Sequence, residues 1–466
     1  MDGTDRRARL ARSRLYLVLE ARPGGRDPSP LLDAALRGGV DVVQLRDKVL
    51  ADEELVAAAE PFRRACAAHG ALFVLNDRPD LVERCGADGV HVGQGDVSVA
   101  DARRAVGRER LVGLSVSTPE DLGAADVDAD YLGVGAVYGT PTKSEAQPGG
   151  IELVRLARDT LRCPWFAIGG IELDNVKAIA AAGAPGVAVV RAIRDAADPD
   201  SAARALRAVL PPDHAVVSRP GKATTGLLPQ IELLEGTVAP GDGDAPHTHH
   251  VHVDVCYVLD GELDLRLGDG TVRVPAGSCV TAPPYLVHGF RNRTDTNVRY
   301  LNLHAPGVWA RGRLAGEDPA SFDTFGVEGA PPELRGAVSG PGDGDRLQKQ
   351  HRLALVKLDL PEVAVLEYAV DGEYDGASAH VHLRHADCFY VLEGEIELRA
   401  DGETIRVGAG AAIAIPPGVV HAFTSVGSAR FLNVQAPNYG FVDYLRALDA
   451  GHDVDGARHD AYEVGR

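Results

Sequence analysis

The sequence is poor in lysine, has no long hydrophobic run and has no closely spaced pair of cysteines. Of the 48 basic residues in the 466-residue chain, only six are lysines, so each lysine is an uncommon choice. No apolar stretch reaches the roughly 18 residues that a membrane-spanning helix needs, so we expect no membrane partner. The basic start, Arg6 to Arg14, precedes only a short apolar segment, which argues against a signal peptide. We therefore expect a cytoplasmic protein.

The cysteines and the net charge exclude two further classes. The six cysteines are scattered and form no C-x-x-C pair, so we expect reduced and mostly buried thiols. A net charge of -19 argues against a general nucleic-acid binder, because phosphate backbones favour positive surfaces. Local basic sites for a small phosphorylated ligand are compatible with this charge.

Short apolar, β-branched runs alternate with helical segments through the first half of the chain. Strands that are apolar on both faces and alternate with helices imply parallel pairing under a helical cover. Eight repeats in roughly 200 residues favour a (β/α)8 barrel over an open sheet. The expected strands are Leu15–Glu20, Val40–Leu45, Leu72–Leu75, Gly89–Val92, Leu111–Val116, Tyr131–Val137, Trp165–Ile168 and Gly186–Val190, and the clearest helical stretches are Asp52–His69, Ile151–Leu161 and Leu173–Ala182.

Polar residues gather just after these expected strands, and in such a barrel the carboxyl ends of the strands meet at one mouth. Asp77 and Asp96 follow adjacent strands and could share a Mg²⁺ ion, which binds few carboxylates together with water and phosphate oxygens. Arg46, Lys48 and Lys143 would supply positive charge for a diphosphate. Glycines after the seventh and eighth strands let backbone N–H groups approach a phosphate.

Several ordered motifs make residues 15 to 210 resemble thiamine phosphate synthases. They are Val43-Gln-Leu-Arg-Asp-Lys48, Asn76-Asp-Arg78, Asp88-Gly-Val-His-Val-Gly-Gln-Gly-Asp96, Gly113-Leu-Ser115, Tyr131-Leu-Gly-Val-Gly135, Thr140-Pro-Thr-Lys143, Ala167-Ile-Gly-Gly-Ile171 and Gly186-Val-Ala-Val-Val190. That family joins an aminopyrimidine methyl diphosphate to a thiazole ethyl phosphate, or its carboxy form, and releases pyrophosphate and thiamine monophosphate. Two positions depart from its pattern: Ser117 stands where a His is common, and Gly135-Ala136 stands where Gly-Pro is common. Because the diphosphate-site residues are retained, the resemblance favours the synthase over the related thiazole tautomerase branch.

The resemblance implies a role for each matching residue. The pyrimidine diphosphate would be held by Gln44, Arg46, Lys48, Asn76 and Lys143, with Asp77 and Asp96 on Mg²⁺ and Ser115 near the pyrimidine or the leaving group. The thiazole phosphate would be held by Thr140, Thr142, Gly170 and the region of Val190 and Arg191. Lys143, Arg46 and Ser115 are the predicted catalytic residues, and Lys143 would stabilise charge on the departing diphosphate.

The second half changes to short alternating strands broken by Gly, Pro and Asp, and it repeats itself. His247 and His380 are 133 residues apart, and six further elements recur at the same offset. In each copy, H-x-H places two imidazoles on one face of a strand. The proposed ligand sets are His247, His249, Asp254 and His288 in the first copy, and His380, His382, Asp387 and His421 in the second.

These sets resemble the cupin motifs, so we expect a double jelly roll. Both copies have Asp where that family has Glu, the first copy has Tyr285 where Gly is usual, and the second has Ser425 where Asn is usual. Imidazole with carboxylate suits Fe, Mn, Ni, Zn or Cu, and the sequence does not choose among these or exclude a metal-free jelly roll. His252 and His385 correspond across the copies and could contact a bound ligand.

We therefore predict a barrel over residues 1–212, a linker over 213–225, jelly rolls over 226–310 and 351–440 joined by 311–350, and a tail over 441–466. The second half could be a metal-dependent oxygenase or isomerase, or a module that binds a small molecule. Two other readings stay open for the whole chain: an alkyl transferase of specialised metabolism acting on a modified thiazole or pyrimidine, and a regulator with an inactive barrel. We expect small phosphorylated substrates as partners, and the sequence leaves a homo-oligomer open.

Overall fold

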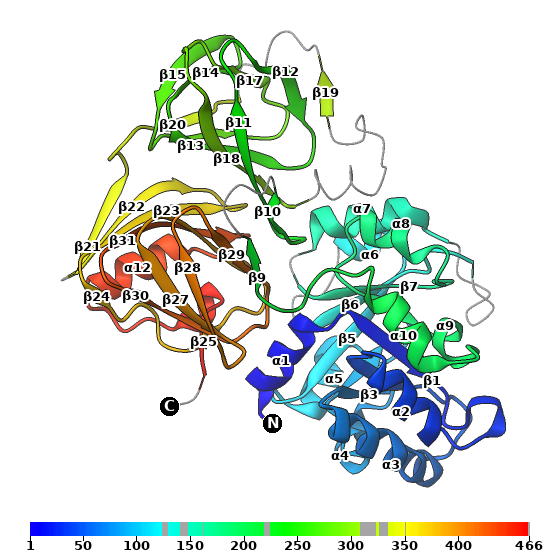
Figure 1. Cartoon of the computed structure of the whole chain (residues 1–466). Coiled ribbons are helices and arrows are strands. Elements are labelled where there is room, and N and C mark those ends of the chain that lie inside the picture. The colour runs from blue at the N-terminus through cyan, green and yellow to red at the C-terminus, as the bar shows by residue number, and fades with distance from the viewer. Residues whose placement is uncertain are drawn as a thin grey trace. The chain divides into compact units, whose positions relative to one another are not determined.

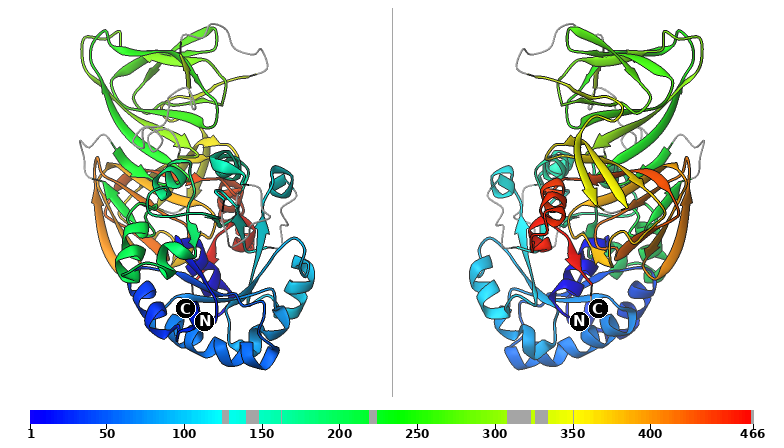
Figure 2. Two further views of the ribbon diagram at one scale, coloured as in Figure 1. Left: turned by 90° about the vertical axis from the view of Figure 1, so that its right-hand side faces the viewer. Right: turned by 90° about the vertical axis from the view of Figure 1, so that its left-hand side faces the viewer.

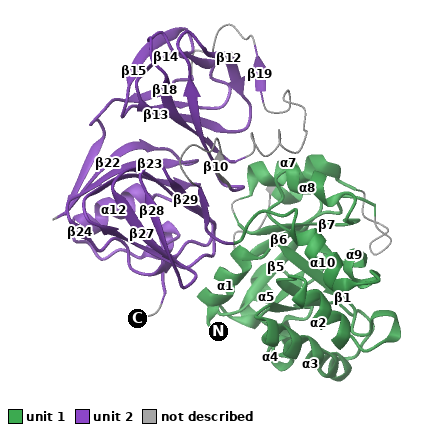
Figure 3. Cartoon of the chain, viewed as in Figure 1, with its two compact units in different colours: residues 1–213 green, residues 214–466 purple. Residues whose placement is uncertain are grey.

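The computed structural model describes residues 1–123, 129–139, 148–161, 163–218, 224–307, 323–325, 334–349 and 351–464. The chain forms two compact units, residues 1–213 and residues 214–466 (Figure 3). Among the described residues, no helix has the length and apolar character to cross a membrane. Five of the six cysteines are buried, and all six are free thiols, as the sequence predicts.

The first unit is a closed barrel of eight parallel strands with its helices outside (Figures 1 and 2). The strands are nearly completely buried on both faces, which explains their continuous apolar composition. The predicted (β/α)8 barrel is therefore confirmed. The strands are β1 (Leu15–Leu19), β2 (Val42–Leu45), β3 (Leu72–Asn76), β4 (Gly89–Val92), β5 (Leu111–Val116), β6 (Tyr131–Val134), β7 (Trp165–Ile168) and β8 (Val187–Val189).

The described helices of the first unit mostly lie between successive strands, and two of them follow β8. They are α2 (Ser29–Arg37), α3 (Asp52–His69), α4 (Val82–Cys85), α5 (Val99–Val106), α6 (Pro119–Gly123), α7 (Gly150–Thr160), α8 (Val176–Ala181), α9 (Arg191–Arg194) and α10 (Pro199–Arg207), with short 3-10 turns at Pro23–Gly25 and Pro79–Leu81.

An additional helix, α1 (Gly3–Arg12), precedes the first strand and was not expected from the sequence. Its arginines pair with acidic residues far along the chain: Arg6 lies 2.9 Å from Asp88, and Arg7 lies 2.7 Å from Asp130. Leu10 of the same helix is buried in the cluster of side chains that fills the barrel interior. The basic start of the chain is therefore part of the barrel unit.

The second unit contains two copies of an antiparallel double sheet, as the repeat predicts. In the first copy, the sheets run β10-β11-β18-β13-β16-β20 and β15-β14-β17-β12-β19; in the second they run β21-β22-β23-β31-β26-β29-β9 and β28-β27-β30-β25-β32. The first copy's strands are β10 (Thr224–Leu227), β11 (Glu232–Val238), β12 (Gly243–His249), β13 (Val253–Asp260), β14 (Glu262–Leu267), β15 (Gly270–Pro275), β16 (Cys279–Ala282), β17 (His288–Arg291), β18 (Val298–Ala305), β19 (Asp323–Phe325) and β20 (Ala337–Ser339).

The second copy includes a strand from before the first copy and segments from the end of the chain. Its elements are β9 (Val216–Ser218), β21 (Asp345–Lys349), β22 (Arg352–Asp359), β23 (Ala364–Val370), β24 (Glu373–Tyr374), β25 (His380–Val381), β26 (Ala386–Glu393), β27 (Glu395–Ala400), β28 (Glu403–Gly408), β29 (Ala412–Ile415), β30 (His421–Val426), β31 (Ala429–Ala436), α12 (Phe441–Asp449), a 3-10 turn at Gly456–His459, and β32 (Tyr462–Glu463).

The two copies exchange strands. Strand β9, which precedes the first copy in the chain, pairs with β29 of the second, and β20, which precedes the second copy, pairs with β16 of the first. A pair of matching hydrogen bonds also crosses between them: the Tyr257 hydroxyl donates to Glu367 at 2.9 Å, and the Tyr390 hydroxyl donates to Glu235 at 3.2 Å. The same surface of each copy therefore faces the other, as in a two-fold dimer built into one chain.

Candidate active site and metal centres

The barrel holds a pocket of about 510 Å³ at the carboxyl ends of its strands. Its floor is formed by the barrel interior, where the rings of Tyr16 and Tyr131 pack edge-on against Phe166 at centroid distances of 5.3 and 6.0 Å. The loops after the strands supply its polar rim. This is the place at which (β/α)8 enzymes build active sites.

Ten of the thirteen barrel residues predicted as site residues line this pocket. They are Gln44, Arg46, Lys48, Asn76, Asp77, Asp96, Ser115, Gly170, Val190 and Arg191. The remaining three, Thr140, Thr142 and Lys143, lie outside the described residues, so their predicted roles stay predictions. The sequence therefore located the pocket, and the role of each residue there is still a hypothesis.

The charged groups of the pocket differ in how they are paired. Lys48 lies 2.9 Å from Asp77, and Arg191 lies 3.2 Å from Glu172. Asp96 accepts the backbone N–H of Gly93 at 2.9 Å. The guanidinium of Arg46 makes no ion pair or hydrogen bond with a described residue and is only partly exposed. Among the described cations of this pocket, Arg46 is therefore the one most available to an anionic ligand.

A chain of hydrogen-bonded side chains crosses the floor of the pocket and was not predicted from the sequence. The amide nitrogen of Gln44 donates to the Tyr16 hydroxyl at 2.9 Å, which lies 3.0 Å from the Tyr131 hydroxyl. That hydroxyl lies 3.2 Å from Nδ1 of His91, whose Nε2 lies 2.9 Å from the Ser115 hydroxyl. The chain joins two predicted substrate-binding residues, Gln44 and Ser115.

One arrangement of protons that is consistent with this geometry starts from Gln44. An amide nitrogen can only donate, so the Tyr16 oxygen accepts from Gln44, and in this arrangement the Tyr16 proton goes to Tyr131. Tyr131 then donates to His91, which donates through Nε2 to Ser115. The amide oxygen of Gln44 and the hydroxyl proton of Ser115 are thereby left for a ligand, so the chain presents one acceptor and one donor. Burial raises the pKa of both tyrosines, so they stay protonated at neutral pH.

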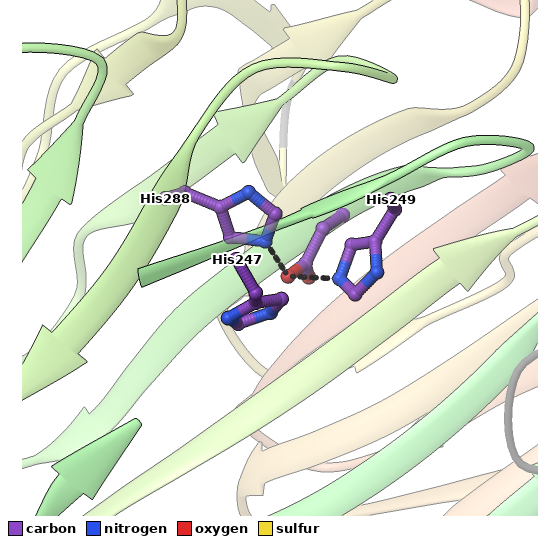
Figure 4. A group of neighbouring side chains, drawn as sticks. His247, His249 and His288 are labelled. Carbon is purple, nitrogen blue, oxygen red and sulfur yellow. Dashed lines mark hydrogen bonds and ion pairs between the residues drawn. The ribbon is translucent and has the colours of Figure 1, made fainter. Parts of the chain in front are cut away.

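In the second unit, the predicted ligands of the first copy come together. One ligand atom from each of His247, His249, Asp254 and His288 lies within 4.8 Å of the others, and all four residues are buried. The Asp254 carboxylate lies 3.0 Å from Nε2 of His288 and 3.4 Å from Nε2 of His249, and Figure 4 shows the three imidazoles around that carboxylate. The shorter Asp thus reaches the centre that the histidines surround.

The second copy repeats this arrangement. His380, His382, Asp387 and His421 also lie within 4.8 Å of one another through one ligand atom each. Oδ2 of Asp387 lies 3.3 Å from Nε2 of His421 and 4.0 Å from Nε2 of His382. The other carboxylate oxygen, Oδ1, accepts from the amides of Asn433 at 2.6 Å and Gln435 at 2.8 Å.

All six ligand histidines have Nδ1 beside an oxygen atom. Five of these oxygens are backbone carbonyls, and the exception is His249, whose Nδ1 lies 2.6 Å from the Asp323 carboxylate. The partners of the others are Ala245 for His247, Leu286 for His288, Ser378 for His380, Asp460 for His382 and Val419 for His421, at 2.7 to 3.0 Å. An imidazole that donates from Nδ1 presents the lone pair of Nε2, which is how histidine commonly binds a metal ion.

The electrostatics of the two copies differ. Burial and the neighbouring His421 lower the pKa of His380 to about 3, and burial lowers that of His382 well below its ordinary value. Burial also lowers the pKa of His249, but the carboxylates of Asp254 and Asp323 outweigh it and raise the value to about 9. In addition, Nε2 of His382 is buried without a hydrogen-bond partner among the described residues. Neutral imidazoles with a bare Nε2 fit a transition-metal ion.

The departures from the cupin pattern at Tyr285 and Ser425 have structural counterparts. Tyr285 adopts φ of 66°, in the left-handed region, and Gly418 of the second copy adopts 85° at the corresponding turn. The backbone N–H of each residue donates to the carbonyl of the second His of its H-x-H motif, at 2.7 Å in both copies. The Ser425 hydroxyl both donates and accepts, as an asparagine side chain can. It donates to the carbonyl of Gly372 and accepts from the backbone N–H of Tyr374.

Comparison with known proteins gives a family match for each of the two units. A closed (β/α)8 barrel with a polar pocket at the carboxyl ends of its strands is the architecture on which barrel enzymes build active sites. Residues 15–193 match the thiamine monophosphate synthase family, and the chain belongs to this family through its first unit. The first unit is therefore a transferase by class. Residues 234–304 and 367–435 each match the cupin domain family, so the second unit is a double cupin.

Two relatives carry the family assignment. The thiamine-phosphate synthase of Thermobifida fusca is 46% identical over 210 residues, which is 44% of this chain and 96% of the relative. That of Gloeobacter violaceus is 47% identical over 198 residues, which is 42% of this chain and 57% of the relative's length. Among solved structures, the salicylate 1,2-dioxygenase of Pseudoaminobacter salicylatoxidans is 14% identical, with a TM-score of 0.35 over 47% of this chain and 70% of that chain.

Proposed function

We propose that the first unit joins an aminopyrimidine methyl diphosphate to a thiazole ethyl phosphate and releases pyrophosphate and thiamine monophosphate; with the carboxy form of the thiazole, the carboxyl group also leaves as CO₂. The observation that carries the proposal is the pocket itself: ten predicted ligands line it, and Arg46 there has no described partner. A cytoplasmic location, phosphorylated small molecules as the partners and the absence of nucleic-acid or membrane partners stay predictions from the sequence.

In this reaction the bond from the pyrimidine methylene to the diphosphate oxygen breaks, and the thiazole nitrogen forms the new bond to that carbon. The electron pair of the broken bond leaves with pyrophosphate. Catalysis therefore depends on positioning and on neutralising charge on the leaving group. Arg46 and Lys48 supply positive charge at the pocket rim, and Gln44 and Ser115 orient the pyrimidine through the acceptor and the donor that they present.

Asp77 and Asp96 are the residues that would hold Mg²⁺. Both line the pocket, and oxygen ligands of this type with added water and phosphate oxygens are those that Mg²⁺ favours. When bound, Mg²⁺ would neutralise part of the diphosphate charge. The present pairing of Asp77 with Lys48 means that these two groups would rearrange together when a diphosphate enters.

Arg46→Ala tests this assignment, with Arg37→Ala as the matched control. Arg37 lies on α2, where it pairs with Asp33 and Asp200 at the surface. We expect Arg46→Ala to lower kcat/KM for the pyrimidine diphosphate at least tenfold, because a charge-assisted contact to phosphate contributes about 1.5–3 kcal/mol. Arg37→Ala should leave it unchanged. Equal activity of both variants and the wild type would contradict the assignment.

For the second unit, we propose that each cupin copy binds one transition-metal ion through its three histidines and its aspartate. The supporting observation is that all six histidines have Nδ1 beside an oxygen and Nε2 toward the centre. Fe, Mn, Ni, Zn and Cu all suit this donor set. Metal analysis of the purified chain, before and after chelation, tests the proposal. Binding of fewer than two ions per chain by the chelated protein on reloading would overturn it.

A further inference from the structure

The first cupin copy contains more buried metal-binding groups than one ion requires. Beyond the four proposed ligands, the interior of this copy also buries His252, His304 and Glu232, whose exposed fractions are 0%, 1% and 0%. His249, His252 and His304 form a second group whose ligand atoms lie within 4.8 Å of one another. The ring of His252 packs against both others, at centroid distances of 4.1 Å from His249 and 4.5 Å from His304.

The second copy lacks this arrangement at the same positions. In the first copy, His304 on β18 is paired in register with Glu232 on β11 and with Asp254 on β13. In the second copy, Gln435 on β31 is paired with Ala364 on β23 and with Asp387 on β26. The imidazole of His304 and the carboxylate of Glu232 therefore have no counterpart at these positions. The second group of the second copy is instead His382, His385 and Asp460, whose ligand atoms also lie within 4.8 Å of one another.

The two oxygens of Asp254 face different groups. Oδ2 lies near Nε2 of His288 and His249, as described above, whereas Oδ1 lies 3.9 Å from Nε2 of His304. Oδ1 also accepts a hydrogen bond from the side-chain amide of Asn302, as the corresponding oxygen of the second copy, Oδ1 of Asp387, does from the amides of Asn433 and Gln435. A carboxylate whose oxygens face two sets of imidazoles is suited to bridge two metal ions, which in such sites lie roughly 3.5–4 Å apart.

The orientation of His304 matches that of the six proposed ligand histidines. Its Nδ1 lies 3.4 Å from the Glu232 carboxylate, and its Nε2 faces Asp254 and shares a hydrogen bond of 2.9 Å with the side-chain amide of Asn302, which a bound ion would replace. His252 differs from its counterpart His385, whose Nδ1 bonds the Asp460 carboxylate at 2.8 Å. Neither ring nitrogen of His252 has a hydrogen-bond partner among the described residues. Such a buried, unpaired imidazole is a costly feature unless a ligand completes it.

We propose that the first cupin copy binds a second divalent transition-metal ion, held by His252 and His304, with Asp254 bridging it to the first ion. This inference builds on the mononuclear centre proposed above and adds a neighbouring site to it. The Glu232 carboxylate orients His304 through Nδ1, as the Asp323 carboxylate does for His249. The second copy, with Gln435 and Ala364, keeps a single ion.

Metal counting with four variants of the full chain tests the proposal. The chain is chelated with EDTA, reloaded with Zn²⁺, desalted, and analysed for zinc per chain. His304→Gln installs the residue that the second copy carries at this position, so the fold accommodates it. His247→Ala removes a ligand of the first ion only. The double variant combines the two, and His250→Gln, which replaces a more exposed histidine of the same copy, is the matched control.

We expect His304→Gln and His247→Ala each to lose one zinc per chain, the double variant to lose two, and His250→Gln to lose none. Melting curves of the chelated proteins verify that each variant is folded before loading. Unchanged zinc in His304→Gln overturns the second site. Loss of only one zinc by the double variant shows a single ion shared by both sets of residues and also overturns it. Loss in His247→Ala without loss in His304→Gln leaves the mononuclear centre standing, so the two proposals fail separately.

Discussion

Tyr16→Phe is the substitution that most sharply tests the hydrogen-bond chain in the barrel pocket. The Tyr16 hydroxyl accepts from Gln44 at 2.9 Å and lies 3.0 Å from the Tyr131 hydroxyl, and all three side chains are buried. Removing this oxygen leaves the Gln44 amide and the Tyr131 hydroxyl each without one partner. An unpaired buried polar group costs about 1–3 kcal/mol, and water in the pocket can recover part of that.

We therefore expect Tyr16→Phe to lower the free energy of unfolding of the barrel by about 2 kcal/mol. Because the Gln44 amide then loses its fixed orientation, KM for the pyrimidine diphosphate should rise more than kcat falls. Denaturant unfolding and steady-state kinetics measure the two effects. Tyr138→Phe is the matched control, because the partly buried Tyr138 hydroxyl makes no hydrogen bond with a described residue.

A double-mutant cycle with Tyr131→Phe examines whether the two tyrosines act as one chain. Residues that share a hydrogen bond show coupling energies of about 0.5 kcal/mol or more, whereas independent residues are additive. Strict additivity, or a Tyr16→Phe variant with the stability and KM of the wild type, would refute the reasoning.

Three further predictions concern stability. Tyr285→Gly should raise the free energy of unfolding of the first cupin copy by about 1 kcal/mol in denaturant unfolding, because glycine adopts the φ of 66° without steric cost, and a decrease would contradict this. Tyr257→Phe and Tyr390→Phe should each cost about 1.5 kcal/mol and add together, because each removes a different hydrogen bond of the matching pair described above, and strong coupling in the double variant would argue against separate contacts. Burial raises the pKa of Tyr16 and Tyr131 above the unfolded value of about 10. Their contribution to the stability of the folded state is therefore complete below about pH 10 and is lost as the pH rises above it. The unfolding free energy should fall above about pH 10, and less steeply in Tyr16→Phe than in the wild type.

The barrel strands could be predicted because each is a short apolar run that is buried on both faces, and their observed bounds differ from the expected ones by three residues at most. Helix α1 could not, because its arginines are held by Asp88 and Asp130, which lie far along the chain. The polar chain was missed for a related reason. In strands that are apolar on both faces, the sequence does not show that Tyr16 and Tyr131 point inward to meet.

The ligand sets of the cupin copies could be predicted because H-x-H spacing and the repeat fix which side chains share a face. The strand exchange could not, since β9 and β20 are short and each pairs with the other copy. The repeat did not predict His304 as a ligand, because the residue at the corresponding position of the second copy is Gln435. The sequence marks His304 only as a difference between the two copies. Comparing the copies for unmatched histidines would have found it.

The most direct test of the central claim is the formation of thiamine monophosphate by the purified full chain with Mg²⁺, the pyrimidine diphosphate and the thiazole phosphate. Mass spectrometry identifies the product, and a coupled assay measures pyrophosphate. The account predicts equal amounts of both, and at least tenfold slower formation of both at low pyrimidine diphosphate concentration in Arg46→Ala. A folded wild-type chain that forms neither product would contradict the proposed reaction.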